Sequence, residues 1–256
     1  MNGAFYIGAT GLAAEQRALE VIANNIANIN TPAFKRAEVR FSELVAENGG
    51  TSDQPLTTNG LAPLLGVMVD SSPRLFAQGE ITQTGKPLDL AIDGDGFIEL
   101  MGPGGQAMLW RGGTLQVNSD GYLAGANGLP LKAMISVPTG SSQLSVGSDG
   151  KVQALLPGQT SPTEIGQIDL ALPKDMTTLQ SMNNGLYQTA SESDLLTVAP
   201  GQDGGGVISP GALESSNVQL ADEMITLLLL QRAYAANAQV VQAGDQLMSI
   251  ANSLRR

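Results

Sequence analysis

The stretch "NVQLADEMITLLLLQRAYAANAQVVQAGDQLMSIANSL", from Asn217 to Leu254, decides the fold, because its apolar residues recur every three or four positions. This spacing predicts an α-helix, which would be about 57 Å long at about 1.5 Å per residue. Ser216 and Gln219 fit a capping box at its start. The apolar positions form two stripes, and such a helix must bury both. The first stripe is Leu229, Ala233, Ala236, Val240, Ala243, Leu247, Ile250 and Leu254, and the second is Met224, Leu227, Tyr234, Val241 and Met248.

The N-terminus predicts a second helix, from about Gly3 to Asn30. Its apolar residues follow coiled-coil spacing, although Glu15 interrupts the seam. The dipeptide Thr31-Pro32 ends the helix, since proline disfavours helical conformation in the residue before it. The seam consists of Leu12, Leu19, Ile22, Ile26 and Ile29.

Asparagines are unusually frequent at the end of this N-terminal helix. Asn24, Asn25 and Asn28 lie beside the isoleucine seam, where an amide can both donate and accept across an uncharged contact. We predict Asn24 and Asn25 as contacts between subunits. Asn28 and Asn30 fit the capping of the helix end.

The composition excludes several classes of function. The chain has 256 residues and a formal net charge of −11. Residues 49–210 contribute −9 of this charge, from 15 acidic and 6 basic residues. So acidic a chain is unsuited to nucleic-acid binding. Without cysteine or histidine it lacks disulfides, catalytic triads and the usual zinc ligands.

The termini carry no sign of membrane targeting. The first residues lack the basic and apolar regions of a signal peptide, so no cleaved signal is expected. The most apolar segment, "MITLLLLQRAYAA" (224–236), is too short to span a bilayer. We therefore expect no membrane insertion.

The middle of the chain is predicted to be β-structure. The segments "LQVNSDGYL" (115–123) and "LSVGSDGKV" (144–152) each place Asp-Gly between alternating residues, which indicates hairpins. Short strands without intervening helices favour a twisted antiparallel sheet or a small barrel. The polar stretch "AENGGTSDQPLTTNG" (46–60) is typical of an extended or disordered connector.

The predicted fold class is therefore α+β, with long terminal helices packed as a coiled-coil-like pair and a central all-β domain. The predicted segments are an N-terminal helix in 1–33, an extended connector in 34–73, the β domain in 74–210 and a C-terminal helix in 211–256. One apolar stripe can pack on the other terminal helix, and the second requires neighbouring copies of the protein.

Three stretches resemble the rod proteins of the bacterial flagellar basal body. "ANNIANINTPAFK" (23–35) is similar to their N-terminal signature, and "ESSNVQLADEMITLLLLQRAYAANAQ" (214–239) to its C-terminal counterpart. "QGEITQTGKPLDLAIDGDGFIEL" (78–100) resembles a segment between them. "WRGGTL" (110–115) and "GSDGKVQALLPGQ" (147–159) are similar to the distal-rod type. Ala33 replaces a usual glycine and the connector is short, so the proximal-rod type is the alternative.

The resemblance implies a structural role. Rod proteins of this kind are exported unfolded by the flagellar export apparatus and polymerise helically in the periplasm. Their terminal helices form an inner tube, and the rod transmits torque to the hook through the peptidoglycan-layer and outer-membrane rings. The implied partners are copies of this chain, other rod and hook proteins, ring proteins and the export apparatus. No catalytic residue, cofactor or metal is implied. The residues expected at subunit interfaces are Ile22, Asn24, Asn25, Ile26, Asn28, Ile29, Leu229, Arg232, Tyr234, Val240, Leu247 and Ile250.

Two other functions are compatible with single features. The carboxylates Asp89, Asp93, Asp95 and Glu99 could serve a hydrolase as an acid–base pair, although no aromatic sugar platform accompanies them. The helices could instead join a secreted scaffold or adhesin. The "DGDG" at residues 93–96 lacks the further ligands of a calcium loop and predicts a tight turn.

Overall fold

The computed structural model describes residues 2–45, 64–69, 73–189 and 191–253. The chain divides into two compact units, which are described separately below. The helical unit comprises Met1–Ala27, Ala37–Pro73 and Gln219–Arg256, and the β unit comprises Asn28–Arg36 and Arg74–Val218. The two helices and many antiparallel strands confirm the α+β class. The two units are defined by contacts between residues and do not test the four segments predicted from the sequence, which stay a prediction.

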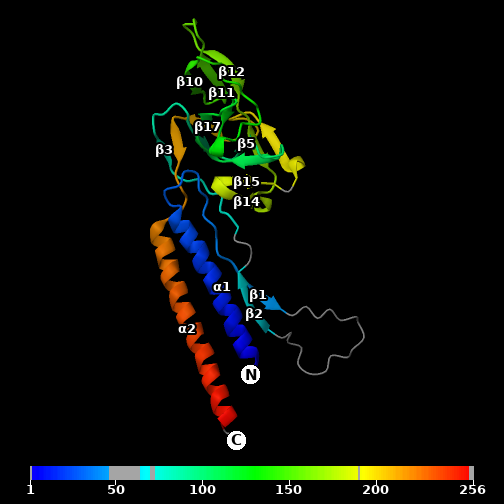
Figure 1. The fold of residues 1–256 in the computed structure, drawn as a ribbon, viewed down its shortest axis with the longest axis vertical. Coiled ribbons are helices and arrows are strands. Elements are labelled where there is room, and N and C mark those ends of the chain that lie inside the picture. The colour runs from blue at the N-terminus through cyan, green and yellow to red at the C-terminus, as the bar shows by residue number, and fades with distance from the viewer. Residues whose placement is uncertain (1, 46–63, 70–72, 190, 254–256) are drawn as a thin grey trace, which may run out of the picture. The chain divides into compact units, whose positions relative to one another are not determined.

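In the helical unit, helices α1 (Asn2–Ala27) and α2 (Leu220–Ser253) lie side by side and antiparallel (Figure 1). Near the start of α1 the helices are close: a Cβ atom on Gly8 would lie 2.7 Å from Val241 Cγ2. At the other end of α1, Asn25 contacts Glu223 in the first turn of α2. Only glycine at position 8 lets α1 come this close to Val241 of α2, because a Cβ atom there would clash.

The most buried line along α1 differs from the predicted leucine–isoleucine seam. Leu19 and Ile26 pack against the core of the helical unit but are only partly buried. Small residues lie deeper, because they allow the backbones to approach. Over residues 6–27 of α1, where burial is described, the buried residues are Gly8, Gly11, Ala14, Glu15, Ala18, Ile22 and Asn25.

The segment after α1 adds a two-stranded antiparallel ribbon to the helical unit. It pairs β1 (Phe41–Val45) with β2 (Leu64–Val69), and Val69 joins the core that contains Ala18 and Leu230. The connector predicted for 34–73 therefore includes two strands where the structure describes it. Its polar stretch at 46–60 lies outside the described residues.

The β unit is built on a six-stranded antiparallel sheet of order β14-β15-β6-β5-β13-β16. Alternate residues of β5 enter two cores: Ile98 joins a large aliphatic cluster around Trp110, whereas Phe97 joins a cluster with Tyr187. The strands are β5 (Phe97–Met101), β6 (Ala107–Trp110), β13 (Leu170–Pro173), β14 (Gln180–Ser181), β15 (Leu186–Gln188) and β16 (Leu195–Val198).

Smaller sheets complete the β unit, and none of the sheets formed by the described residues closes into a barrel. The three-stranded sheets are β17 (Val207–Pro210), β4 (Asp89–Asp93) and β7 (Gly112–Thr114), and β10 (Ser142–Val146), β11 (Lys151–Leu155) and β12 (Thr163–Gln167). The pairs are β18 (Ala212–Glu214) with β3 (Ile81–Gln83), and β8 (Gln116–Val117) with β9 (Leu123–Ala124). Short 3-10 turns are η1 (Ala126–Gly128), η2 (Met176–Thr178), η3 (Asn183–Gly185) and η4 (Glu192–Asp194).

Both predicted hairpins are confirmed. Val117 pairs with Leu123, and Val146 pairs with Val152, across the two Asp-Gly turns. Gly121 and Gly150 in these turns have φ angles of 81° and 82°. Glycine adopts such angles without steric cost, which explains the turn at each position.

The helix ends differ from the sequence predictions. Helix α1 ends at Ala27, and α2 begins at Leu220 rather than at Asn217. The predicted capping box is wrong, because Ser216 Oγ accepts a hydrogen bond from Val218 N before the helix begins. The amide of Asn217 is used elsewhere, as described below.

Candidate assembly surfaces and the buried junction

Helix α2 exposes its first predicted apolar stripe and buries the second only in part, since Met224 is 52% exposed. Leu229, Val240, Leu247 and Ile250 are between 55 and 62% exposed. Their spacing of 11, 7 and 3 residues puts them on one face of the helix, since about 3.6 residues make a turn. Contiguous exposed apolar area of this kind marks an interaction surface.

The opposite face of α2 packs inside the helical unit. Leu230 is buried, Leu227 packs against the same core, and Val241 approaches Gly8. Asn237 Nδ2 donates to Glu15 Oε1 at 2.8 Å, so the glutamate that interrupts the predicted seam is bonded between the helices. Of the other two interface candidates, Arg232 is exposed and Tyr234 is 41% exposed.

The interface candidates of α1 and its C-terminal end fall into three groups. Ile22 is buried in the core of the helical unit. Ile26, Asn28 and Ile29 are partly buried, and Asn24 is exposed. Asn28 Oδ1 accepts from Thr31 Oγ1 at 3.1 Å, a bond between side chains, and the capping role of this residue stays a prediction.

Asn25 is fully buried and has an internal role. Its Nδ2 donates to the carbonyl of Ala37 at 2.9 Å, and its Oδ1 accepts from Ala37 N at 2.9 Å. The same Nδ2 lies 3.3 Å from Oε2 of Glu223, which is also buried. One amide thus ties α1 to the following segment and to α2.

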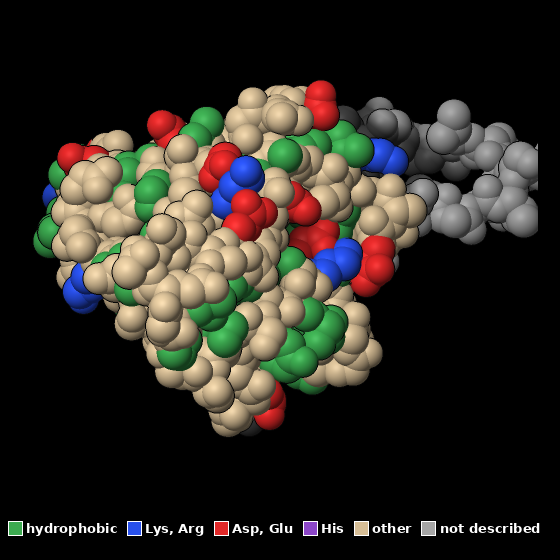
Figure 2. Space-filling view, turned by 90° about the horizontal axis from the view of Figure 1, so that it is seen from above, with side chains coloured by type: hydrophobic (Ala, Val, Ile, Leu, Met, Phe, Trp, Pro, Cys, Tyr) green, Lys and Arg blue, Asp and Glu red, His purple; other side chains and the backbone are tan. Residues whose placement is uncertain are grey.

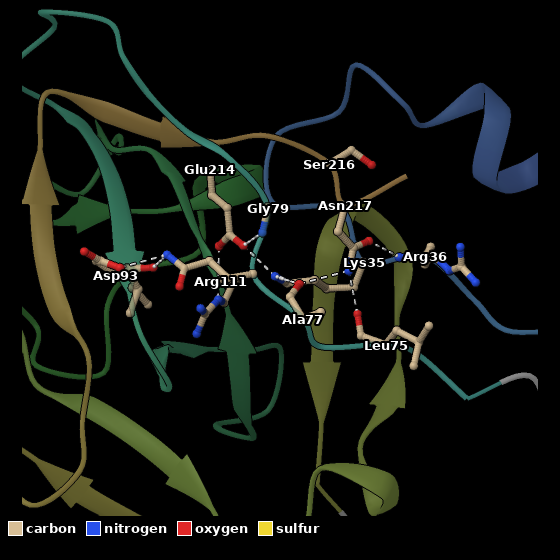
Figure 3. A network of polar contacts seen from close by, with 12 residues as sticks. Lys35, Arg36, Leu75, Ala77, Gly79, Asp93, Arg111, Glu214, Ser216 and Asn217 are labelled. Atoms are coloured by element: carbon tan, nitrogen blue, oxygen red, sulfur yellow. Dashed lines mark hydrogen bonds and ion pairs between the residues drawn. The ribbon is translucent and has the colours of Figure 1, made fainter. Parts of the chain in front are cut away.

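The β unit contains a buried ionic junction centred on Glu214, the last residue of β18 (Figure 3). Glu214 Oε1 accepts from Lys35 Nζ at 2.5 Å and from Gly79 N at 2.8 Å. Glu214 Oε2 accepts from Arg111 Nε at 3.1 Å. Three chain segments, around residues 35, 79 and 111, therefore converge on one carboxylate.

The two cations of the junction are also bonded to backbone carbonyls. Lys35 Nζ donates to Ala77 O at 2.9 Å, and the Arg111 guanidinium donates to the carbonyls of Gly94 and Gly96. Lys35, Arg111 and Glu214 are each at most 3% exposed. Burial lowers the pKa of Lys35, and the hydrogen bond that Lys35 donates to Glu214 opposes this shift. The carboxylate is needed there because an unpaired buried cation is strongly unfavourable.

Amide side chains extend the junction on both sides. Asn217 Oδ1 accepts from Arg36 N, and Asn217 Nδ2 donates to the carbonyls of Leu75 and Ala77 (Figure 3). Gln78 Oε1 accepts from Gly94 N, and Gln78 Nε2 donates to Asp93 Oδ1 at 3.1 Å. Within the β unit, Asn217 thereby joins the residues just before α2 to Arg36 and to the segment 75–77.

Three of the four carboxylates considered for a hydrolase are engaged in separate contacts, and the fourth, Asp95, is exposed. Asp89 accepts hydrogen bonds from Thr84 and Thr114, Asp93 accepts from Gln78, and Glu99 pairs with Lys132. Acidic and basic side chains lie together on the face drawn in Figure 2, where apolar side chains form small separate patches. In the described part of the chain no group of acidic residues is arranged to hold a metal ion.

Neither α1 nor α2, over the residues that the structure describes, has an apolar segment long enough to cross a bilayer.

Sequence reasoning did not find the ionic junction. Lys35 and Glu214 lie within the quoted motifs, and Arg111 lies within "WRGGTL". Lys35 and Glu214 are 179 residues apart, however, and no periodic pattern links them. The available signal was the presence of a charged residue in each of three otherwise weakly charged motifs.

Comparison with protein families places the chain among the rod and hook proteins of the bacterial flagellum. Residues 5–35 match a family described as "Flagella basal body rod protein". Residues 91–154 match "Flagellar hook protein FlgE/F/G D1 domain", and residues 209–254 match "Flagellar basal body rod FlgEFG protein C-terminal". The three matches cover both helices and part of the β unit.

Full-length relatives define the family more narrowly. The flagellar basal-body rod protein FlgG of Buchnera aphidicola (subspecies Schizaphis graminum) is 34% identical over 97% of this chain and 98% of its own length. FlgG of Borreliella burgdorferi is 31% identical over the whole of both chains. A relative named FlgF, from Caulobacter vibrioides, is 31% identical over 94% of this chain and 93% of its own length. The chain belongs to the FlgG family of flagellar basal-body rod proteins, and it is a structural subunit of the rod.

Proposed function

We propose that this chain assembles helically with copies of itself into the distal part of the flagellar rod, a hollow shaft that transmits torque from motor to hook. The observation that carries the proposal is the exposed apolar face of α2, defined by Leu229, Val240, Leu247 and Ile250. Burying an aliphatic side chain stabilises by about 1.5–3 kcal/mol. The four side chains of this face are 55–62% exposed in the subunit, so burying each of them on assembly would stabilise the rod by about 1–2 kcal/mol.

The geometry of the helical unit supports neighbouring copies as the occupants of this face. The side of α2 that faces α1 is already filled by Leu230, Asn237 and Val241. A second apolar face on the same helix requires a second partner. Contacts between unlike faces of identical subunits that do not close into a ring produce a helical polymer.

The packing of α1 on α2 supports a coiled-coil-like pair as the building block. Gly11, Glu15, Ala18 and Ile22 of α1 are buried at steps of three and four residues. Such a repeat keeps one seam facing the partner helix. Glu15 with Asn237, and Asn25 with Glu223, supply polar contacts that favour one register.

The proposed partners follow from the family. They are other copies of this chain, the neighbouring rod and hook proteins, the ring proteins of the peptidoglycan layer and outer membrane, and the export apparatus. The proposed location is the periplasmic part of the basal body. We propose no catalytic function, cofactor or metal for this subunit.

The test replaces one residue of the exposed face by a charge. Leu247→Asp places a carboxylate where the proposal puts an apolar contact, so rods should fail to assemble and cells should lose motility. Gln242→Asp adds the same charge to an exposed position on the flank of α2 and should leave motility intact. Both variants should keep the helix content of the monomer. Normal rod assembly by Leu247→Asp would contradict the proposed interface.

A further inference from the structure

A pocket in the β unit is lined by residues that take no part in the proposed α2 interface. It has a volume of about 210 Å³ and lies between strands β5, β13 and the segment 131–133. Its apolar wall includes Ile98, Leu131, Ile168 and Leu170, which are all buried. Sites for drug-sized ligands and cofactors measure about 300–1,000 Å³. This pocket therefore suits a single side chain or a fragment of similar size.

One carboxylate in the wall is incompletely bonded. Glu99 is 8% exposed, and its Oε2 pairs with Lys132 Nζ at 2.5 Å. Its Oε1 is buried and makes no hydrogen bond. A buried acceptor without a donor is unfavourable, so a ligand that brings a donor to Oε1 gains more than an apolar one.

The charges around the pocket favour a cation. Glu99 and Asp169 line the pocket, and Glu192 is close enough to contribute to the raised pKa of Lys132, behind the larger effect of the Glu99 hydrogen bond. Glu99 and Glu192 act on the Lys132 ammonium and Asp169 lines the same pocket, so a second positive charge would bring this acidic region nearer to neutrality. The Lys132 side chain is 51% exposed and flexible enough to move aside for an incoming group.

We propose that this pocket binds an aliphatic primary ammonium, supplied by the lysine side chain of a partner chain. The methylene stem would lie on Leu131 and Leu170, and the ammonium would donate to Glu99 Oε1. Thr197, which lines the pocket, is exposed and lies on β16, the edge strand of the large sheet, where a partner chain has access. This inference is independent of the proposed α2 interface, because all lining residues belong to the β unit.

The experiment is a titration of the full chain with small probes, followed by NMR of isotope-labelled isoleucine and leucine methyl groups. N-acetyl-lysine methylamide should shift the Leu131 and Leu170 methyl resonances and saturate. N-acetyl-norleucine methylamide has the same stem without the charge and should bind at least about tenfold more weakly. Equal binding of both probes, or no shift with the lysine probe, would overturn the proposal. n-Pentylamine tests the source: if it binds and the lysine probe does not, the partner-chain origin is wrong.

Variants separate the carboxylate from the fold. Glu99→Gln should weaken the lysine probe by about tenfold or more, whereas Glu164→Gln, which alters an exposed carboxylate on β12, should not. Thr197→Tyr narrows the pocket mouth while it keeps the Glu99–Lys132 pair, and it should also abolish binding. Native methyl spectra in each variant establish folding. Unchanged affinity in folded Glu99→Gln, or in Thr197→Tyr, would contradict the assigned site.

Discussion

Replacing Glu214 by glutamine should destabilise the β unit far more than the same change at the surface. The carboxylate accepts hydrogen bonds from Lys35, Gly79 and Arg111. A glutamine offers one acceptor oxygen, and its amide nitrogen would face donors. Removing one member of a buried charge cluster costs about 3–5 kcal/mol, because the remaining charges stay buried without compensation. We expect a loss of this size from the free energy of unfolding.

The assay is urea denaturation followed by the fluorescence of Trp110, the single tryptophan of the chain, which lies in the core of the β unit. With a slope of about 2 kcal/mol per molar urea, the midpoint should fall by about 1.5–2.5 M. Glu164→Gln is the matched control, since Glu164 is half exposed and 3.7 Å from Lys151. It should change stability by less than about 1 kcal/mol.

A third variant separates the carboxylate from its cations. Lys35→Met leaves Glu214 bonded to Arg111 and Gly79, and it removes a cation whose burial already lowers its pKa. Its loss of stability should therefore be smaller than that of Glu214→Gln. If Glu214→Gln shifted the midpoint no more than Glu164→Gln, the reasoning from burial would be refuted.

Three further changes have defined outcomes. Burial raises the pKa of Tyr187 to about 12, so the unfolded chain releases this proton at a lower pH than the folded chain does. The free energy of unfolding should therefore fall by about 1.4 kcal/mol per pH unit from about pH 10 to about pH 12. In Tyr187→Phe this part of the alkaline loss should be absent from urea titrations, and an equal loss in both proteins would exclude the residue as its source. Ala33 has a φ of 57°, so Ala33→Gly should relieve about 1–2 kcal/mol of strain, reduced by about 0.4–1 kcal/mol of unfolded-state entropy; a lower urea midpoint would contradict this. Asn25→Ala leaves the N–H and C=O of Ala37 unpaired and should destabilise the helical unit by about 2–4 kcal/mol in circular-dichroism melts, against about 0.5 kcal/mol or less for Gln16→Ala at an exposed position of α1.

The long elements could be predicted because their patterns are local. The three-and-four spacing along residues 217–254 is sufficient for α2, and the Asp-Gly turns are sufficient for the two hairpins. The helix ends could not be predicted as well, because Asn217 forms hydrogen bonds with Arg36, Leu75 and Ala77 rather than extending a helix. Those contacts depend on residues far away in the sequence.

The candidate surfaces were predicted only in part, because helical spacing is a local pattern whereas packing depends on distant residues. Spacing identified the exposed stripe of α2. The second stripe packs inside the subunit only in part, because Met224 and Tyr234 are exposed whereas Leu230, which belongs to neither stripe, is buried. For α1, apolar size was a poor guide, since Gly8, Gly11 and Ala18 lie deeper than Leu12 and Leu19. The amide of Asn25 was read as a surface feature, yet the chain folds Ala37 back onto it.

The central claim is that the exposed face of α2 becomes buried between subunits of the rod. Because the chain has no cysteine, Leu247→Cys introduces a single thiol on this face, and Asp149→Cys introduces one at an exposed turn of the β unit. The measurement is the rate of thiol labelling in the monomer and in purified rods. Leu247→Cys should react readily in the monomer and be protected in the rod by at least about tenfold relative to Asp149→Cys. Equal labelling of Leu247→Cys in monomer and rod would contradict the central claim.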